Sequence, residues 1–260
     1  MSEQLSGKVA LVTGGTSGIG EAAVQGLVNA GARVVFTGNN QEAGNRISAA
    51  NGAIFVRHQV QDAAGWEQVK ATIMQNYGRL DIAFANAGTN AGDSDIETVP
   101  LEAWQRIIDI NLTGSMLTCK AAIALMKDNP DNAGGSIVVN SSINGLLALA
   151  DDVTYSTTKG ALRLLAKSVA VYCARAKNGI RCNTIHPGVV ETALISKAIN
   201  DAPDPAAARR MLEGVSPSGR MAQCDEIVSL LLYLASDASR YVNGSEMVID
   251  GGATAGLPGV

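Results

Sequence analysis

Tyr155 and Lys159 stand four positions apart, and Ser142 precedes the tyrosine by thirteen. Residues 153–177 have the pattern of one helix, on which positions i and i+4 point their side chains from the same face. An ammonium close to a phenol favours the phenolate, so we expect Lys159 to lower the Tyr155 pKa from its free value of about 10. Such a tyrosine can exchange a proton with an alcohol or a ketone, while Ser142 holds the same oxygen by a second hydrogen bond. Because this spacing is also common in helices without chemistry, the rest of the chain must decide.

A glycine-rich turn lies near the start of the chain, between an apolar run at 8–13 and a helical pattern at 19–30. Its glycines permit a tight turn, a close approach of the backbone to a pyrophosphate, and packing of the helix on the strand. The alternative is that they only make a turn. The pattern favours a dinucleotide site, whose residues in this turn are Gly14, Thr16, Ser17, Gly18, Ile19 and Gly20.

The elements that must position these side chains follow a regular alternation of short apolar runs and helical patterns. After the first strand, further strands are expected at 32–37, 53–58, 80–85, 136–140, 180–185 and 246–249. This alternation predicts one α/β domain over residues 1–260, a Rossmann-type, doubly wound parallel sheet of about seven strands with helices on both faces. Residues 190–215 read as a helical, mobile lid broken by prolines.

The motifs occur in an order that resembles the short-chain dehydrogenase/reductase family from about residue 7 to residue 252. They include Asn86-Ala87-Gly88, Asn111 and Pro187-Gly188 in addition to the turn and the Ser-Tyr-Lys set. Within the family, the chain is most similar to bacterial secondary-alcohol and hydroxysteroid dehydrogenases. The resemblance implies an enzyme that transfers a hydride reversibly between a nicotinamide and a secondary alcohol/ketone pair.

The same resemblance implies a role for each catalytic candidate. Tyr155 would give or take the hydroxyl proton, Lys159 would also hold the nicotinamide ribose, and Ser142, with Ser141 as the fallback, would position the carbonyl. Asn111 would hold the lysine through water and a backbone carbonyl. His186 precedes Pro-Gly in a slot that is structural in the family, so we do not expect it to be a general base.

The resemblance also implies cofactor contacts beyond the glycine turn. Two departures stand out, since Gln59 and Ala85 replace an aspartate and an asparagine that the family commonly carries. The contacts are Gly38, Asn39, Gln59, Val60, Asn86, Ala87, Gly88, Tyr155, Lys159, Pro187, Gly188, Val190 and Thr192.

The choice between NAD and NADP depends on the end of the second strand. In enzymes of this family that use NAD, an acidic residue usually bonds the ribose at the position of Gly38. In those that use NADP, a basic residue usually bonds the phosphate at the position of Asn39 or Ser17. Without a guanidinium the phosphate loses roughly 1.5–3 kcal/mol of charge-assisted bonding. We therefore predict NAD, with NADP as the alternative.

An apolar stretch at 143–149 follows Ser142 and is expected to form one wall of the substrate site. No fixed charge stands in it, so the predicted substrate is an apolar secondary alcohol or ketone. Alternatives are a reductase of 3-oxoacyl chains on a carrier, a sugar or polyol reductase, and a non-catalytic cofactor-binding regulator. The expected substrate contacts are Ser142, Asn144, Leu149, Tyr155 and Val189.

Composition narrows the partners and the location. The chain has 47% hydrophobic residues and a net charge of −4, which argue for a packed core and against nucleic acid or an anionic membrane. We see no signal-peptide pattern and no apolar run close to the ~18 residues of a membrane span, so we expect a cytoplasmic protein. Two histidines and four scattered cysteines predict no metal site. By resemblance, pairing of the long helices around Asn111 and Lys159 predicts a homotetramer.

Overall fold

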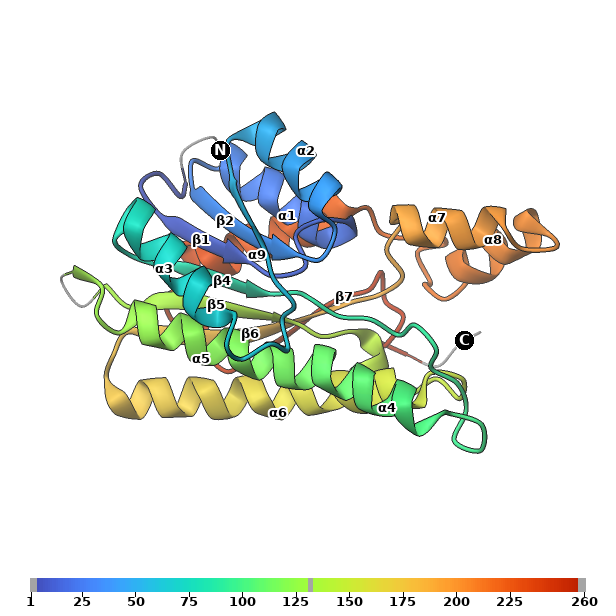
Figure 1. The fold of residues 1–260 in the computed structure, drawn as a ribbon. Coiled ribbons are helices and arrows are strands. Elements are labelled where there is room, and N and C mark those ends of the chain that lie inside the picture. Colours follow the sequence, from blue (N-terminus) through green and yellow to red (C-terminus); the bar gives the residue numbers. More distant parts are fainter. Residues whose placement is uncertain (1–3, 131–132, 257–260) are drawn as a thin grey trace.

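The computed structural model describes residues 4–130 and 133–256. Seven parallel strands form one sheet in the order β3-β2-β1-β4-β5-β6-β7 (Figure 1). From β1 the strand order runs towards one edge of the sheet, and from β4 it runs towards the other edge. The carboxyl ends of these two strands therefore border the place where such folds bind ligands. The strands are β1 (Val9–Val12), β2 (Arg33–Gly38), β3 (Ile54–Arg57), β4 (Ile82–Ala85), β5 (Gly135–Asn140), β6 (Ile180–Pro187) and β7 (Glu246–Ile249).

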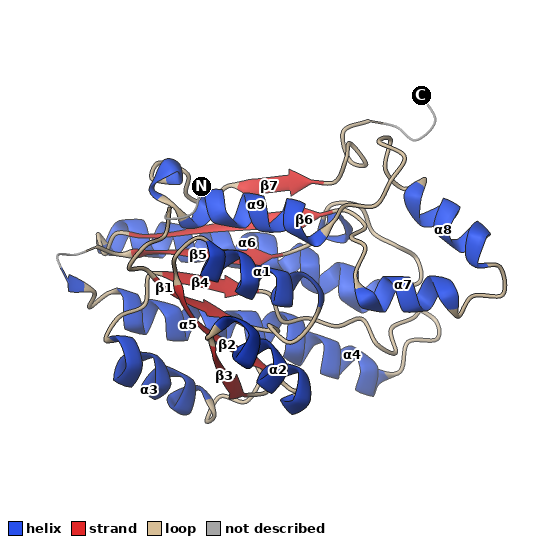
Figure 2. Cartoon of the chain, turned by 90° about the horizontal axis from the view of Figure 1, so that it is seen from above, coloured by secondary structure: helices blue, strands red, loops and turns tan. Residues whose placement is uncertain are grey.

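Helices cover both faces of the sheet, as Figures 1 and 2 show. On one face lie α1 (Gly18–Asn29), α2 (Gln41–Asn51) and α9 (Cys224–Ala235). On the other lie α3 (Trp66–Tyr77), α4 (Leu101–Ile108), α5 (Gly114–Met126) and α6 (Val153–Ala176). Short helical turns are η1 (Asp109–Thr113), η3 (Ile143–Gly145) and η4 (Asp237–Ser239). The predicted fold class is confirmed.

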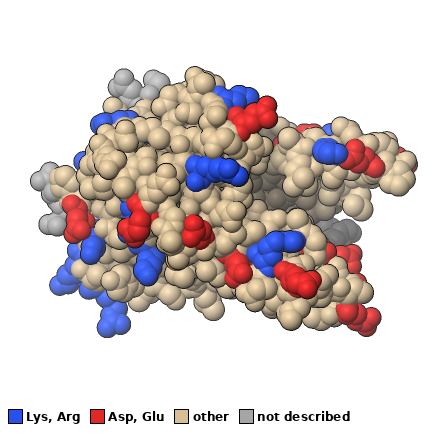
Figure 3. All heavy atoms as spheres, in the orientation of Figure 1, with Lys and Arg blue, Asp and Glu red and all other residues tan. Residues whose placement is uncertain are grey.

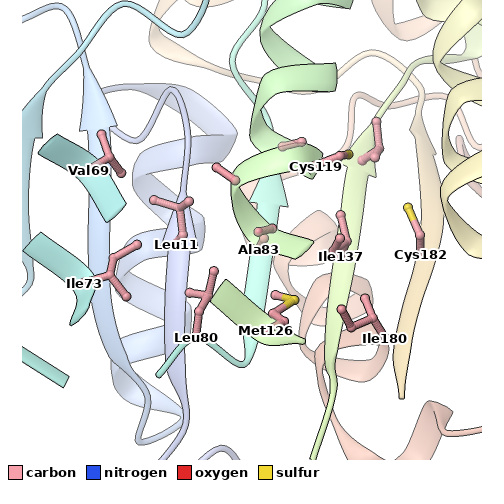
Figure 4. Packing of buried hydrophobic residues seen from close by; sticks show 14 of the residues in the cluster. Leu11, Val69, Ile73, Leu80, Ala83, Cys119, Met126, Ile137, Ile180 and Cys182 are labelled. Carbon is pink, nitrogen blue, oxygen red and sulfur yellow. The ribbon is translucent and has the colours of Figure 1, made fainter. Parts of the chain in front are cut away.

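Each face of the sheet has its own buried cluster. In the cluster drawn in Figure 4, Leu11, Ala83 and Ile137 of three neighbouring strands pack against Ile73 of α3 and Met126 of α5. Covering on both faces explains why β1 and β4 are continuous apolar runs, all of whose residues are buried.

The long helix expected at 101–126 contains one π-helical turn, η1, between α4 and α5. π-turns are rare and often mark functional positions. The run Leu101–Met126 is also the one helix among the described residues that is long and apolar enough, by length and composition, to cross a membrane. It is not an unbroken apolar run, because polar residues such as Asn111 and Lys120 interrupt it. Here α5 packs on the sheet and contributes Ala122 and Met126 to its core.

The proline-broken segment forms two helices, α7 (Ala193–Asn200) and α8 (Pro205–Glu213). Asp204 caps α8 by accepting from the amide of Ala207 at 2.9 Å, and Pro205 occupies the first turn, where its missing N–H costs nothing. Ile199 is the single buried residue of the two helices. The pair therefore projects from the body as an arm (Figure 1).

Candidate active site

The predicted catalytic residues gather at the carboxyl ends of the central strands. Ser142 follows β5, and Tyr155 and Lys159 lie in the first two turns of α6. The Ser142 side chain is close enough to Tyr155 to lower its pKa, and Lys159 Nζ lies 5.3 Å from the centre of the Tyr155 ring. The structure thus brings these three side chains together, and Ser141 instead donates its hydroxyl to the Lys159 carbonyl at 2.8 Å.

Burial controls the protonation of this pair. It raises the pKa of Tyr155 to about 12, although the Ser142 side chain acts in the opposite direction. It also lowers the pKa of Lys159 to about 8. The expected lowering of the Tyr155 pKa is therefore not what this structure gives, because desolvation of the phenolate outweighs the opposing effect of Ser142. At neutral pH the pair is a phenol beside an ammonium.

A chain of hydrogen bonds through two asparagines holds Lys159 in place. Its Nζ donates to the Asn140 carbonyl at 2.8 Å, and Asn140 Nδ2 donates to Asn86 Oδ1 at 2.9 Å. Asn86 Nδ2 in turn donates to the Thr13 carbonyl at 3.0 Å. Thr13 and Asn140 were missed as site residues. Their signal was a polar residue at the carboxyl end of a buried apolar strand.

Asn111 is fully buried in the π-turn η1. Its Nδ2 donates to the Thr89 carbonyl at 2.9 Å and to Thr158 Oγ1 at 3.0 Å, while its Oδ1 accepts from the Thr89 amide at 2.8 Å. The amide therefore joins α6 to the segment after β4. A Cβ built on Gly88 would lie 3.3 Å from Asn111 Oδ1 and 3.5 Å from Lys159 Nζ, so both atoms face this glycine. A water-mediated link between them stays a prediction.

A carboxylate from another segment caps the catalytic helix. Asp93 accepts from the amides of Thr154 at 3.2 Å and Tyr155 at 2.6 Å. Asp152, the residue before α6, makes no side-chain cap bond to it. This contact was missed, because sequence spacing shows no relation between a loop residue and a helix about sixty positions later.

The glycine turn fits a dinucleotide phosphate. Gly14 has φ +66°, and a Cβ there would lie 2.8 Å from Ala87 Cα, so the turn packs directly on the segment after β4. Ser17, the residue before α1, makes no side-chain cap bond. The first amides of α1 are consequently available to an anion at the positive end of the helix.

The end of β2 is the predicted adenosine side. A Cβ on Gly38 would lie 2.5 Å from Thr16 Cγ2, so Thr16 fills the slot of an acidic side chain. Asn39 and Gln59 are exposed. Val60 is buried, and its carbonyl accepts from Trp66 Nε1 at 3.0 Å.

On the opposite side, β6 ends at Pro187 and the chain turns at Gly188. Val190 is buried, whereas Val189 is partly exposed. Thr192 Oγ1 accepts from the Ile195 amide at 3.3 Å and so caps α7. Thr192 Cγ2 would lie 3.3 Å from a Cβ on Gly18, which places the base of the arm beside the glycine turn.

Exposed apolar side chains flank the catalytic group. Leu147 and Leu149 follow η3, and Leu194 and Met211 lie on the arm, all with more than half of their surface exposed. Asn144 is partly buried, and its amide donates to Ser142 Oγ at 3.1 Å. Figure 3 shows the surface hollowed between the arm and the part of the molecule below it, with neighbouring basic and acidic groups at the rim.

Comparisons with known proteins agree with this geometry. A family model described as Enoyl-(Acyl carrier protein) reductase matches residues 14–254. The chain is 35% identical to an NADP-dependent (R)-specific alcohol dehydrogenase of Lentilactobacillus kefiri, over 98% of this chain and 100% of the relative. It is 40% identical to a 3-alpha-(or 20-beta)-hydroxysteroid dehydrogenase of Mycobacterium bovis, over 99% and 93%. A crystal structure of a short-chain type dehydrogenase/reductase from Mycobacterium marinum superposes with a TM-score of 0.85 at 34% identity, over 97% of both chains.

Proposed function

Because the chain belongs to the short-chain dehydrogenase/reductase family, we propose that it interconverts apolar secondary alcohols and ketones with a nicotinamide cofactor. One observation carries the proposal: the neighbouring hydroxyls of Ser142 and Tyr155, with the Lys159 ammonium beside the ring, lie in the same fold as a glycine turn shaped for a dinucleotide. Curated relatives named as alcohol and hydroxysteroid dehydrogenases support the same reaction.

Each side chain has a defined task in ketone reduction. The reduced nicotinamide, when bound, supplies the hydride to the carbonyl carbon. Tyr155 donates its proton to the carbonyl oxygen, and the Ser142 hydroxyl bonds the same oxygen as charge develops there. The Lys159 ammonium then stabilises the phenolate left on Tyr155. Asn111 keeps α6 in register with the segment after β4.

The cofactor is held by three groups of residues. The glycine turn and the start of α1 bind the phosphates, the ends of β2 and β3 bind the adenosine, and the turn after β6 binds the nicotinamide. We propose that Gly14, Thr16–Gly20, Gly38, Asn39, Gln59, Val60, Asn86–Gly88, Tyr155, Lys159, Pro187, Gly188, Val190 and Thr192 make these contacts.

We propose NAD as the preferred cofactor. Arg46 is 2.8 Å from Glu21, and Arg33, at the amino end of β2, lies 5.4 Å from the Tyr77 ring. Both cations are thus engaged by other side chains. Two observations favour NADP instead. Arg57 of β3 pairs in register with Gly38, which brings a cation to the end of β2, and the Lentilactobacillus relative is NADP-dependent. A tenfold preference for NADP that Arg57→Gln abolishes would show this alternative to be correct.

The substrate is proposed to be a neutral, fairly apolar alcohol or ketone. Ser142, Asn144, Leu149, Tyr155 and Val189 would line its site, and the exposed leucines beside them offer apolar contact. An acidic acyl carrier would need free positive charge near this mouth. On the arm, however, Lys197 pairs with Asp201 and Arg209 with Glu191, so that among its described cations Arg210 is the single one outside these pairs, too little for an acidic carrier.

A cytoplasmic homotetramer without metal is proposed for the assembled protein. Its four cysteines are all free, as in a reducing compartment. In the ranges that the structure describes, no three His, Cys, Asp or Glu side chains are grouped as metal ligands. The net charge of −4 disfavours nucleic acid and anionic membranes as partners.

A substrate panel tests the proposal. Oxidation of short aliphatic, cyclic, aryl and steroid secondary alcohols is measured with NAD and with NADP, beside a polyol and a 3-oxoacyl thioester in the reduction direction. We expect the highest kcat/KM for a neutral cyclic or aryl compound. A preference for the polyol or thioester would contradict the substrate class, and no turnover of any compound would favour a cofactor-binding regulator.

A further inference from the structure

His186 is fully buried directly behind the turn that carries Ser142. Its Nδ1 lies 3.1 Å from the Ser142 carbonyl oxygen, and its Nε2 lies 2.9 Å from Thr184 Oγ1. A carbonyl oxygen only accepts, so Nδ1 must carry the proton, and Nε2 then accepts from the Thr184 hydroxyl. Both ring nitrogens are committed, which fixes the tautomer and the orientation of the ring.

A second contact holds the other end of the same turn. Arg163 of α6 donates from Nη1 to the Gly145 carbonyl at 3.0 Å and from Nε to Glu246 at 2.6 Å. The same Glu246 oxygen lies 3.6 Å from His186 Nε2. The turn from Ser142 to Gly145 is therefore pinned at both ends by one connected group on β6, α6 and β7.

We propose that His186 is a positioning residue for the reaction, whose Nδ1–H holds the Ser142 peptide so that the serine hydroxyl stays aimed at Tyr155 and at the substrate oxygen. The role rests on the proposed function, because Ser142 acts only if a ketone or alcohol is turned over. The ring touches no reacting atom and transfers no proton. Burial lowers the His186 pKa, so the ring is neutral at pH 7 and suited to this bond.

The backbone explains how the effect reaches the hydroxyl. Ser142 is extended, with φ −167° and ψ 161°, and its Oγ accepts from the Asn144 amide two residues later. Loss of the bond to the Ser142 carbonyl frees this ψ angle and with it the turn that holds Oγ. A displacement of about 1 Å in a positioning group can cost on the order of 100-fold in rate.

Two substitutions at His186 distinguish the effect of the Nδ1–H hydrogen bond from the effect of the ring's volume. His186→Leu removes the donor, whereas the Nδ2 of His186→Asn takes nearly the place of Nδ1. We expect His186→Leu to lower kcat by roughly 10- to 100-fold with cofactor Kd changed less than about twofold, and His186→Asn to stay within about threefold of wild type. Ile180→Ala, buried at the far end of β6, is the control for lost stability and should lower Tm while leaving kcat within about twofold.

A double-mutant cycle with Ser142→Ala decides whether His186 acts through the serine. If it does, His186→Leu lowers kcat by less than about twofold in the Ser142→Ala background. An equal loss in both backgrounds, or a folded His186→Asn as poor as His186→Leu, would overturn the proposal. Should His186→Leu not fold, His186→Gln replaces it, because its amide reaches the Nε2 position and not Nδ1. A wild type without turnover refutes the proposed function itself, whereas turnover with an additive cycle refutes only this inference.

Discussion

Tyr155 keeps its proton and Lys159 keeps its charge at neutral pH, because burial places their pKa values at about 12 and about 8. A phenol is the form that can protonate a ketone oxygen, whereas alcohol oxidation needs the phenolate. At neutral pH the site is in the protonation state that ketone reduction needs. The rate of reduction at higher pH then depends on whether Lys159 is still protonated.

The pH profile of ketone reduction follows from this pair. We expect kcat/KM to be constant below about pH 8 and to fall by about tenfold per pH unit above it, since deprotonation removes the charge that stabilises the forming phenolate. Rates measured from about pH 6 to about pH 10 in buffers of constant ionic strength check this. A flat profile beyond about pH 9.5 would contradict it.

The buried charge of Lys159 should also lower the free energy of unfolding. Its folded pKa of about 8 lies below its model value of 10.5, so the folded state binds fewer protons between these values and stability rises with pH across that window. The penalty is complete below about pH 8. Lys159→Met should therefore be inactive yet more stable at pH 7 by roughly 1–3 kcal/mol.

Urea unfolding of wild type and Lys159→Met at several pH values measures that difference. The stability gap should shrink as pH rises from about 8 to 10.5. Lys120→Met is the control, because Lys120 is exposed on α5 and its charge is not buried. A variant less stable than wild type at pH 7 would show that the bond from Lys159 to the Asn140 carbonyl outweighs the burial of the charge.

At this scale the sequence identified the reactive side chains but not their supports. Residue type and spacing, together with the other motifs of the chain, identify Ser142, Tyr155 and Lys159, because the chemistry needs those groups. The direction of the Tyr155 pKa depends on burial, which no spacing reveals. The contacts of Asp93, Asn140 and His186 join segments far apart in the chain and required the fold.

Among the elements, strands and helices were predictable where a simple rule acts. Buried strands read as apolar runs, and Pro205 marks the start of α8 after the break in the arm. The π-turn η1 was not predictable, because it arises where Asn111 reaches both Thr89 and Thr158. A helical pattern alone indicates an uninterrupted α-helix.

The end of β2 and the start of α2 set the cofactor preference. Asn40 is occupied as the cap of α2, accepting from the Ala43 amide at 3.0 Å, whereas the neighbouring Asn39 is exposed. If NAD is preferred, Asn39→Arg should move the ratio of kcat/KM towards NADP by about tenfold or more, since it adds a fork for the phosphate.

Parallel kinetics with both cofactors measure this ratio. Asn45→Arg, in the second turn of α2 and six residues after Asn39, supplies the same charge at another position and should change the ratio less than about twofold. An unchanged ratio in Asn39→Arg would mean that the ribose does not lie beside Asn39.

For the whole molecule, the outer face of α6 is the feature that favours assembly. Leu164, Val171 and Tyr172 are 58–69% exposed and border a groove of about 780 Å³. Light scattering should give four times the chain mass of 26.8 kDa. Leu164→Asp should give smaller species, because it places a charge in an apolar interface, whereas Leu194→Asp on the arm should not. A wild type of monomer mass would contradict the homotetramer.

The most direct test of the account is ketone-dependent consumption of reduced nicotinamide by wild type, Tyr155→Phe and Tyr241→Phe. Tyr241 is fully exposed outside the site and the predicted interface, so its variant controls for the loss of a phenol hydroxyl. We predict that Tyr155→Phe loses on the order of 10²–10⁴-fold in kcat, with cofactor Kd nearly unchanged, and that Tyr241→Phe behaves as wild type. A Tyr155→Phe enzyme that keeps more than about a tenth of the activity would remove Tyr155 from its role as the proton donor.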